Sequence, residues 1–406
     1  MEIKTVGGGI CAPKGFKAAA VHCGIRNNAV KKDLMMIVSD RICDAAAVYT
    51  KNKVKGAPIE VTRENLTDGK ALAVICNSGN ANTCAPGGKE LALQTCSMAA
   101  KHLKCRHEDI IVASTGIIGE KMSLRPFEKG VPELCENLAR KNSLAAAEGI
   151  MTTDTVPKEM AVKFMVSGKE CFIGGIAKGS GMIHPDMATM LCFITSDADI
   201  SAEMLHAALK EDVKNSFNQI SVDGDTSTND MVSVMANGTA GNKRISSVNG
   251  DYEVFAEALH TVTEELAKKM AADGEGAGKL IEILVEGAPD KDTARRISRS
   301  IVASNLFKAA CFGHDANWGR IICAIGYTPG DFSTDKVHIS LASNAGEIQV
   351  CRSSAACGFD EEKAARILSE KEIKVRVDIN QGRAEAKAWG CDLTHDYVTI
   401  NGDKRT

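Results

Sequence analysis

The sequence predicts an α/β protein, because short apolar strand patterns alternate with amphipathic helix patterns along its 406 residues. Ala71–Cys76 and Ile110–Ala113 are continuous apolar runs typical of buried strands, whereas residues 201–209 carry apolar side chains at helical spacing. There is no fixed-period repeat and no low-complexity tract. A chain of this length exceeds what one core usually supports, so we expect more than one domain.

The first half predicts strands followed by a strand–helix alternation. Residues 1–60 mix apolar runs with Gly, Asn and Asp turns and favour strands. The following elements are then expected in order: a strand over Ala71–Cys76, a helix from Gly88 to about Leu103, a strand over Ile110–Ala113, helices to about residue 148, and a hairpin of Ala161–Val166 with Cys171–Ile176 around Ser167-Gly168.

The second half continues the alternation. Ser201 is the expected N-cap of one helix and Asp251 the expected start of another. Gly287-Ala-Pro289 breaks the chain, so we divide it into residues 1–286 and 287–406. The smaller part predicts helices or strands at Thr293–Ala303, Gly319–Ile325, Val337–Leu341, Glu361–Leu368, Ile373–Ile379, Ala384–Ala388 and Tyr397–Ile400.

Composition excludes several classes of function. A net charge of −3 gives no electrostatic case for nucleic acid or an acidic membrane surface, and no apolar stretch approaches transmembrane length. The fifteen cysteines include no Cys-x-x-Cys pair, and many lie in apolar runs, so neither a metal site nor a disulfide framework is expected. The glycine-rich start does not resemble a signal peptide. We therefore expect a cytoplasmic protein without membrane or nucleic-acid partners.

The stretch Lys178–Thr195 is the most unusual in the chain. Its glycines allow sharp turns, Pro185 disfavours helix, and Met190–Ile194 is wholly apolar and predicts a buried strand. Thr189 thus stands where an irregular loop enters a buried strand. On pattern alone, an ordinary strand-starting threonine is the commoner interpretation.

Short sequence motifs along the chain support a more specific interpretation. Ala-Lys-Gly-Ser-Gly-Met followed by Met-Ala-Thr-Met-Leu resembles the self-cleavage site of the ornithine acetyltransferase (glutamate N-acetyltransferase) family of arginine biosynthesis. Further motifs resemble motifs of that family and follow one another in the same order along the chain. They are Asn77-Ser-Gly-Asn-Ala-Asn82, Ser114-Thr-Gly116, Thr152-Thr-Asp-Thr155, residues 221–230, Asp273-Gly-Glu-Gly276, Asn317-Trp-Gly-Arg320 and Trp389-Gly-Cys-Asp-Leu-Thr394. The resemblance implies a four-layer α/β/β/α core with a smaller C-terminal α/β domain.

The resemblance also implies the chemistry. It makes Thr189 the nucleophile and the Ala188–Thr189 bond the autocatalytic cleavage site. Cleavage would free an α-amine with an unperturbed pKa of about 7.7–8.0, which suits a base at neutral pH. Thr115 and Gly116 match the family's oxyanion hole, where a hydroxyl and a backbone N–H stabilise developing negative charge. On sequence pattern alone, Thr115 and Gly116 could equally form an ordinary turn at the end of a strand.

Substrate contacts follow from the same resemblance, which assigns them to Thr152, Lys178, Thr189, Glu275, Asn401 and Thr406. Lys178 would meet a carboxylate and Glu275 an ammonium group, although a solvated loop lysine and a surface acid are the ordinary interpretations. Asn401 and Thr406 imply that the tail returns to the active site. Residues 402–405 depart from the family pattern.

The implied enzyme takes acetyl from N2-acetyl-L-ornithine and passes it to L-glutamate. It needs no cofactor and no metal; the acidic residues within 221–230 lack the spacing of an EF-hand and predict hydrogen-bonded turns. The cleaved α chain (residues 1–188) and β chain (189–406) would stay together, and the family implies an α2β2 heterotetramer.

Three alternatives stay open at this point. A bifunctional, multifunctional form would also use acetyl-CoA as acetyl donor. The same nucleophile with water as acceptor would be an aminopeptidase or amidase. A nucleotide-binding module is the third, although Gly278-Lys279 is followed by Leu280 and fails the P-loop pattern.

Overall fold

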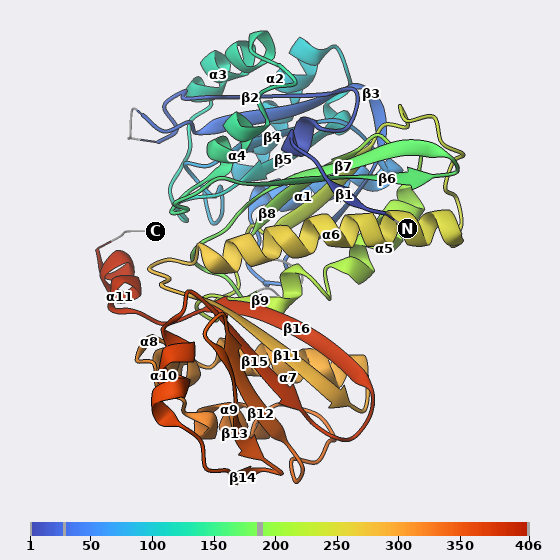
Figure 1. Ribbon diagram of the computed structural model, residues 1–406. Coiled ribbons are helices and arrows are strands. Elements are labelled where there is room, and N and C mark those ends of the chain that lie inside the picture. The colour runs from blue at the N-terminus through green and yellow to red at the C-terminus, as the bar shows by residue number, and fades with distance from the viewer. Residues whose placement is uncertain (1, 27–29, 185–189, 404–406) are drawn as a thin grey trace.

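The computed structural model describes residues 2–26, 30–184 and 190–403, and contains two β-sheets covered by helices (Figure 1). The predicted α/β class is therefore confirmed. Within the described residues, no helix combines the length and apolar character needed to cross a bilayer.

The larger sheet has nine strands among the described residues and is built around one long strand. Its order is β1 (Lys4–Thr5), β6 (Lys158–Val166), β7 (Lys169–Lys178), β8 (Leu191–Ser196), β10 (Met231–Ala236), β3 (Leu34–Tyr49), β4 (Lys70–Asn77) and β5 (Ile110–Ser114), with β2 (Phe16–Val21) also paired to β3. The first part of β3 pairs with β2 and β4, and its last six residues pair with β10. β3 therefore connects the two halves of the sheet.

Three apolar cores show that these two halves pack face to face. One core lies between β6, β7, β8, β10 and the helices α5 (Ala202–Asp212) and α6 (Gly250–Ala272). The middle core joins the other faces of the two halves, for example Phe193 of β8 with Ile37 of β3. The third lies beneath α2 (Gly88–Leu103) and α3 (Arg125–Glu136). Three cores separate four layers, as the α/β/β/α prediction requires.

Two further helices complete this part of the molecule. Helix α4 (Ser143–Ile150) enters the middle core, and α1 (Ala57–Asn65) packs against β5. Short 3-10 turns occupy Gly9–Cys11, Leu66–Asp68, His107–Asp109 and Phe217–Gln219.

The second sheet lies below the first in Figure 1 and has seven strands among the described residues. Its order is β14 (Ala355–Ala356), β13 (Gly346–Arg352), β12 (His338–Ser343), β15 (Glu372–Asp378), β11 (Leu280–Ala288), β16 (Ala384–Cys391) and β9 (Ile220–Ser221). Its helices are α7 (Lys291–Ala303), α8 (Asn305–Phe312), α9 (Trp318–Gly326), α10 (Glu361–Ser369) and α11 (His395–Gly402). The edge strand β9 comes from the first part of the chain, so the second sheet draws on both parts. The division at residue 287 stays a prediction.

Local patterns predicted some elements well and missed others. The hairpin around Ser167-Gly168 is confirmed as the antiparallel pair β6–β7, and Ser201 caps α5 by accepting a 3.3 Å hydrogen bond from the N–H of Met204. The strand-rich prediction for residues 1–60 was wrong at its end, because α1 begins at Ala57, and Pro58 suits the first turn of a helix.

Candidate active site

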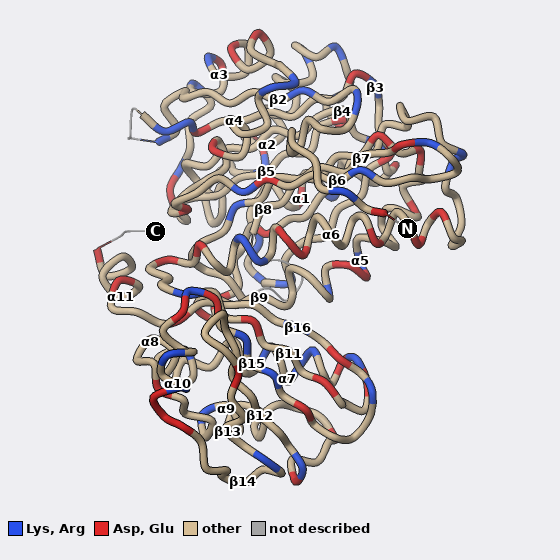
Figure 2. Tube along the Cα trace, viewed as in Figure 1, with Lys and Arg blue, Asp and Glu red and all other residues tan. Residues whose placement is uncertain are grey.

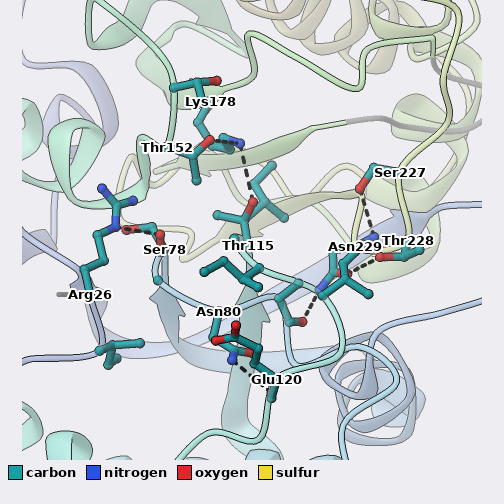
Figure 3. A pocket seen from close by; sticks show the side chains of 18 of the residues that line it. Arg26, Ser78, Asn80, Thr115, Glu120, Thr152, Lys178, Ser227, Thr228 and Asn229 are labelled. Carbon is teal, nitrogen blue, oxygen red and sulfur yellow. Dashed lines mark hydrogen bonds between the residues drawn. The ribbon is translucent and has the colours of Figure 1, made fainter. Parts of the chain in front are cut away.

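A cavity of about 560 Å3 lies where β4, β5 and β7 end and where β8 and β10 begin (Figure 3). Because β4 and β5 are parallel, and β7 is antiparallel to β8, these strand ends meet at one edge of the folded sheet. The loops that leave this edge bring distant parts of the chain together, because the cavity is lined by residues from Gly24 to Asn401.

Six of the residues predicted for the site line this one cavity. They are Thr115, Gly116, Thr152, Lys178, Glu275 and Asn401. The predicted nucleophile and cleavage site, Thr189 and Ala188, and the predicted contact Thr406 lie outside the described residues. Met190 and Leu191, which follow Thr189 in sequence, line the cavity.

Lys178 ends strand β7 with its ammonium group inside the cavity wall (Figure 3). Lys178 is only 7% exposed to solvent. Its Nζ donates hydrogen bonds to Thr152 Oγ1 at 2.8 Å and to Thr115 Oγ1 at 3.4 Å. Burial lowers the pKa of Lys178, and the nearby Asp154 carboxylate opposes that effect. The ammonium group is therefore held in place at the cavity wall by the hydroxyls of Thr152 and Thr115.

A buried ionic chain fixes the segment behind Lys178. The Lys158 Nζ lies 2.7 Å from Asp154 Oδ1 and 2.5 Å from Asp273 Oδ2, and all three side chains are nearly inaccessible to solvent. Asp154 also accepts a 2.7 Å hydrogen bond from the N–H of Gly179. Burial raises the pKa of Asp154, but the charges of Lys178 and Lys158 outweigh it and hold the value at about 2. Asp154 is thus a permanent anion that orders the start of the glycine-rich loop.

Gly116 is required by a close backbone approach. Its φ is +130°, and an added Cβ would lie 2.6 Å from the carbonyl carbon of Gly79 and 2.7 Å from the nitrogen of Asn80. The neighbouring loop is itself held by Asn77, whose Oδ1 accepts hydrogen bonds from the N–H groups of Gly79 and Asn80. A side chain at position 116 would push these two loops apart. Only glycine therefore allows the main chain at this position to lie against the neighbouring loop at the cavity.

Glu275 and Asn401 are hydrogen-bonded to each other and both line the cavity. Asn401, in the exposed helix α11, donates a 2.8 Å hydrogen bond from Nδ2 to Glu275 Oε2. Glu275 is buried, and its N–H donates to the carbonyl of Ser180 at 2.9 Å. Its carboxylate packs against Gly181, where an added Cβ would lie 2.4 Å from an oxygen. Glu275 is therefore fixed in the cavity lining by contacts from Asn401, Ser180 and Gly181.

Four charged residues that line the cavity were not predicted as site residues: Arg26, Glu120, Lys121 and Asp230. Arg26 belongs to a loop whose sequence carries no motif that would have revealed it. Asp230 was assigned with its neighbours to hydrogen-bonded turns. That holds for Asp223, which accepts from the N–H groups of Met182 and Ile183 at 2.6 and 2.8 Å. For Asp230, the backbone carbonyl accepts a 3.0 Å hydrogen bond from the N–H of Thr50, whereas the side-chain Oδ2 has no hydrogen-bond partner among the described residues.

Asp230 is the most deeply buried acid of the cavity, at 2% exposure. It precedes β10, and the N–H of Met231 donates a 3.0 Å hydrogen bond to the carbonyl of Met190. Burial raises the pKa of Asp230 well above the usual value for an aspartate, with Lys178 and hydrogen bonds opposing. The Asp230 carboxyl group therefore lies beside the start of β8 in a setting that disfavours its ionised form, and its burial could not be read from the sequence.

The cavity combines cations, an anion, hydroxyls and backbone groups within a volume suited to a small molecule. Its lining includes both a lysine, Lys178, and a carboxylate side chain, Glu275. In the described part of the chain, no three His, Cys, Asp or Glu side chains gather as metal ligands would. Figure 2 shows acidic and basic residues interspersed along the described part of the chain. The charges that bear on ligand binding are therefore those inside this cavity.

This fold and this cavity define an α/β enzyme with a reaction site for a small polar molecule. Residues 17–406 match the model of the ArgJ family. The chain belongs to the ArgJ family, and the family predicted from its sequence motifs is confirmed.

Two relatives match nearly the whole chain. The arginine biosynthesis bifunctional protein ArgJ 1 of Clostridium acetobutylicum is 48% identical over 392 residues, 96% of each chain. The arginine biosynthesis bifunctional protein ArgJ of Caldanaerobacter subterraneus subsp. tengcongensis is 47% identical over 407 residues, 100% of each chain. A crystal structure of the arginine biosynthesis bifunctional protein from Bacillus halodurans is 45% identical and covers 52% of this chain and 97% of its own, with a TM-score of 0.49.

Proposed function

We propose that this enzyme is a self-processing glutamate N-acetyltransferase that moves acetyl from N2-acetyl-L-ornithine to L-glutamate through an acetyl-Thr189 ester. The relatives are named for arginine biosynthesis, in which this transfer recycles the acetyl group. The observation that carries the proposal is the convergence of Thr115, Gly116, Thr152, Lys178, Glu275 and Asn401 on one cavity, which Met190 also lines. Thr189 is the residue before Met190 in the chain.

Self-processing would begin when Thr189 Oγ attacks the carbonyl carbon of Ala188 and displaces its own amide nitrogen. Water then hydrolyses the resulting ester, which leaves Ala188 as a carboxylate and Thr189 with a free α-amine. One residue then supplies both nucleophile and base. Residues 1–188 and 189–406 would remain associated, because strands from both segments, such as β7 and β8, pair in one sheet.

Acetyl transfer would follow in two half-reactions. The α-amine of Thr189 accepts the hydroxyl proton while Oγ attacks the acetyl carbonyl of N2-acetylornithine. The Thr115 hydroxyl and the Gly116 N–H stabilise the oxyanion, and ornithine leaves as its amine takes the proton. The amine of glutamate then attacks the acetyl ester and restores Thr189.

Substrate binding would use the two poles of the cavity. Lys178, supported by Thr152, binds a carboxylate, and Glu275, oriented by Asn401, binds the side-chain ammonium of the donor. We include Thr406 as a further contact, since the tail follows α11, whose Asn401 lines the cavity. We also include acetyl-CoA as a second donor, because the relatives are named bifunctional, and an α2β2 assembly in the cytoplasm.

The intact mass of freshly purified protein tests self-processing. Wild type should give two masses, for residues 1–188 and 189–406. Thr189→Ala should stay full length and inactive, and Thr189→Ser, which retains a hydroxyl, should still be cut. A cleaved Thr189→Ala chain, or active wild type without a terminus at residue 189, would overturn the proposal.

The acceptor needs its own test, because the same nucleophile with water as acceptor would be a hydrolase. Ornithine release from N2-acetylornithine should accelerate when glutamate is added, with N-acetylglutamate formed in equal amount. Absence of acceleration would favour the hydrolase.

A further inference from the structure

Arg26 is a cation of the cavity wall that the proposed reaction has not yet used. Its guanidinium is fixed by Nε, which donates a 2.7 Å hydrogen bond to the carbonyl of Ser78, and by Nη2, which donates to the carbonyl of Met151 (Figure 3). The loop that carries it is built around the buried Asp33 carboxylate, which accepts hydrogen bonds from the N–H groups of Cys23, Gly24 and Arg26. Both ends of the side chain are therefore positioned before any ligand binds.

In the described part of the chain, Arg26 forms no ion pair with a carboxylate. Both groups that hold the guanidinium are neutral carbonyls, and within the described residues no carboxylate lies within ion-pair distance of it. Burial lowers the pKa of Arg26, with Asp33 and Asp154 opposing from a distance. An arginine keeps its charge even so, and its planar fork of donors matches a carboxylate. A half-buried, uncompensated guanidinium at a cavity wall therefore favours an anionic ligand.

Arg26 and Lys178 bind neighbouring residues of the same loop. Arg26 donates to the carbonyl of Met151, and Lys178 Nζ donates to Thr152 Oγ1. The cavity thus presents two cations close together, each held by neutral groups, with Glu275 as the negative pole. The two proposed substrates differ in this respect: N2-acetylornithine carries one carboxylate and one ammonium group, whereas glutamate carries two carboxylates.

Resting on the proposed function, we propose that Arg26 binds the side-chain carboxylate of the acceptor glutamate, while Lys178 binds the α-carboxylate that both substrates share. One cavity then accepts side chains of opposite charge, because each has its own pole: Glu275 for the donor and Arg26 for the acceptor. Arg26 is in this assignment a specificity-determining residue of the second half-reaction only.

The test separates the two half-reactions. Ornithine release with hydroxylamine as a small neutral acceptor reports on the donor alone, and N-acetylglutamate formation reports on the acceptor. Arg26→Gln should raise the KM for glutamate at least tenfold and leave the KM for N2-acetylornithine in the hydroxylamine assay within twofold. It should also reduce the preference for glutamate over glutamine as acceptor, and Arg26→Lys should restore part of it.

Lys121→Gln is the matched control, because Lys121 is an exposed cation at the same cavity and its loss removes equal charge. Its KM values for both substrates should stay within twofold of wild type. Equal rises in both KM values for Arg26→Gln would overturn the assignment, as would an unchanged KM for glutamate or an unchanged preference over glutamine. If wild type itself releases no ornithine with either acceptor, the proposed function fails, independently of Arg26.

Discussion

Asn401 donates a 2.8 Å hydrogen bond to Glu275, and this single contact ties the last helix of the chain to the loop after α6. Helix α11 has no buried residue, so the contact is not a by-product of core packing. It gives the Glu275 carboxylate a side-chain hydrogen-bond donor in addition to its packing against Gly181. The end of the chain therefore has a role at the proposed site that its exposure alone would not suggest.

Replacing Asn401 should weaken donor binding without unfolding the protein. In Asn401→Ala, Glu275 loses the donor that orients it, and a hydrogen bond to a charged group contributes about 1.5–3 kcal/mol. We expect the KM for N2-acetylornithine to rise at least tenfold, with little change in Tm. Thr399→Ala is the control, because the Thr399 hydroxyl bonds back to the carbonyl of His395 within the same exposed helix. Equal KM values for the two variants would refute the orienting role.

Gly116→Ala should disable the proposed oxyanion hole. The new Cβ would lie 2.6 Å from a Gly79 backbone atom, so the two loops must separate and the Gly116 N–H must move. Loss of one oxyanion donor costs roughly 100- to 1,000-fold in kcat, and we expect a fall of that size in steady-state assays. Gly119→Ala is matched, because Gly119 also has a positive φ, of 84°, but has no atom near its would-be Cβ. If both variants lose kcat equally, backbone strain rather than the close approach is responsible.

Lys158→Met should destabilise the fold strongly. The substitution leaves Asp154 and Asp273 buried without their shared cation, and breaking a buried pair in this way costs about 3–5 kcal/mol. Urea unfolding should show a decrease of that size in the free energy of unfolding. Lys163→Met removes a lysine from the same strand whose partner, Glu170, is exposed, so its effect should stay below about 1 kcal/mol. A similar small change in both variants would show that the buried pair contributes little.

Asp230 should make stability fall as pH rises. Its pKa is raised in the folded protein, so the folded state holds the proton over a range where the unfolded chain has released it. Stability from this group is present below about pH 4, the unfolded pKa, and is lost as pH rises toward the folded pKa. Asp230→Asn stays neutral throughout. The difference in unfolding free energy between Asp230→Asn and wild type should therefore increase in favour of the variant from pH 4 to pH 8 in urea titrations; a difference independent of pH would contradict the raised pKa.

The strands and helices with strong local patterns could be predicted, and the weaker ones could not. Residues 71–76 and 110–113 carry unbroken apolar runs, and they form β4 and β5 with little change in bounds. Residues 1–60 favour strands interrupted by turns, and they include the apolar runs Met35–Val38 and Ala45–Tyr49. Both runs belong to the single strand β3, because pairing with β10 continues the strand past the polar residues between the runs. That pairing is non-local and leaves no periodic signal.

The sequence by itself determined which chemical groups the protein carries and in what order, including the words that identified its family and the residues proposed to bind and react. Only the tertiary structure decided which of them meet. Thr115, Lys178 and Glu275 lie far apart in the chain, and they share a cavity because the ends of their strands and loops meet at one edge of a sheet folded on itself. The environments of Arg26 and Asp230 depend on their burial and on the described groups that surround them. Those quantities are set by every segment packed around a side chain, so no local pattern could have revealed them.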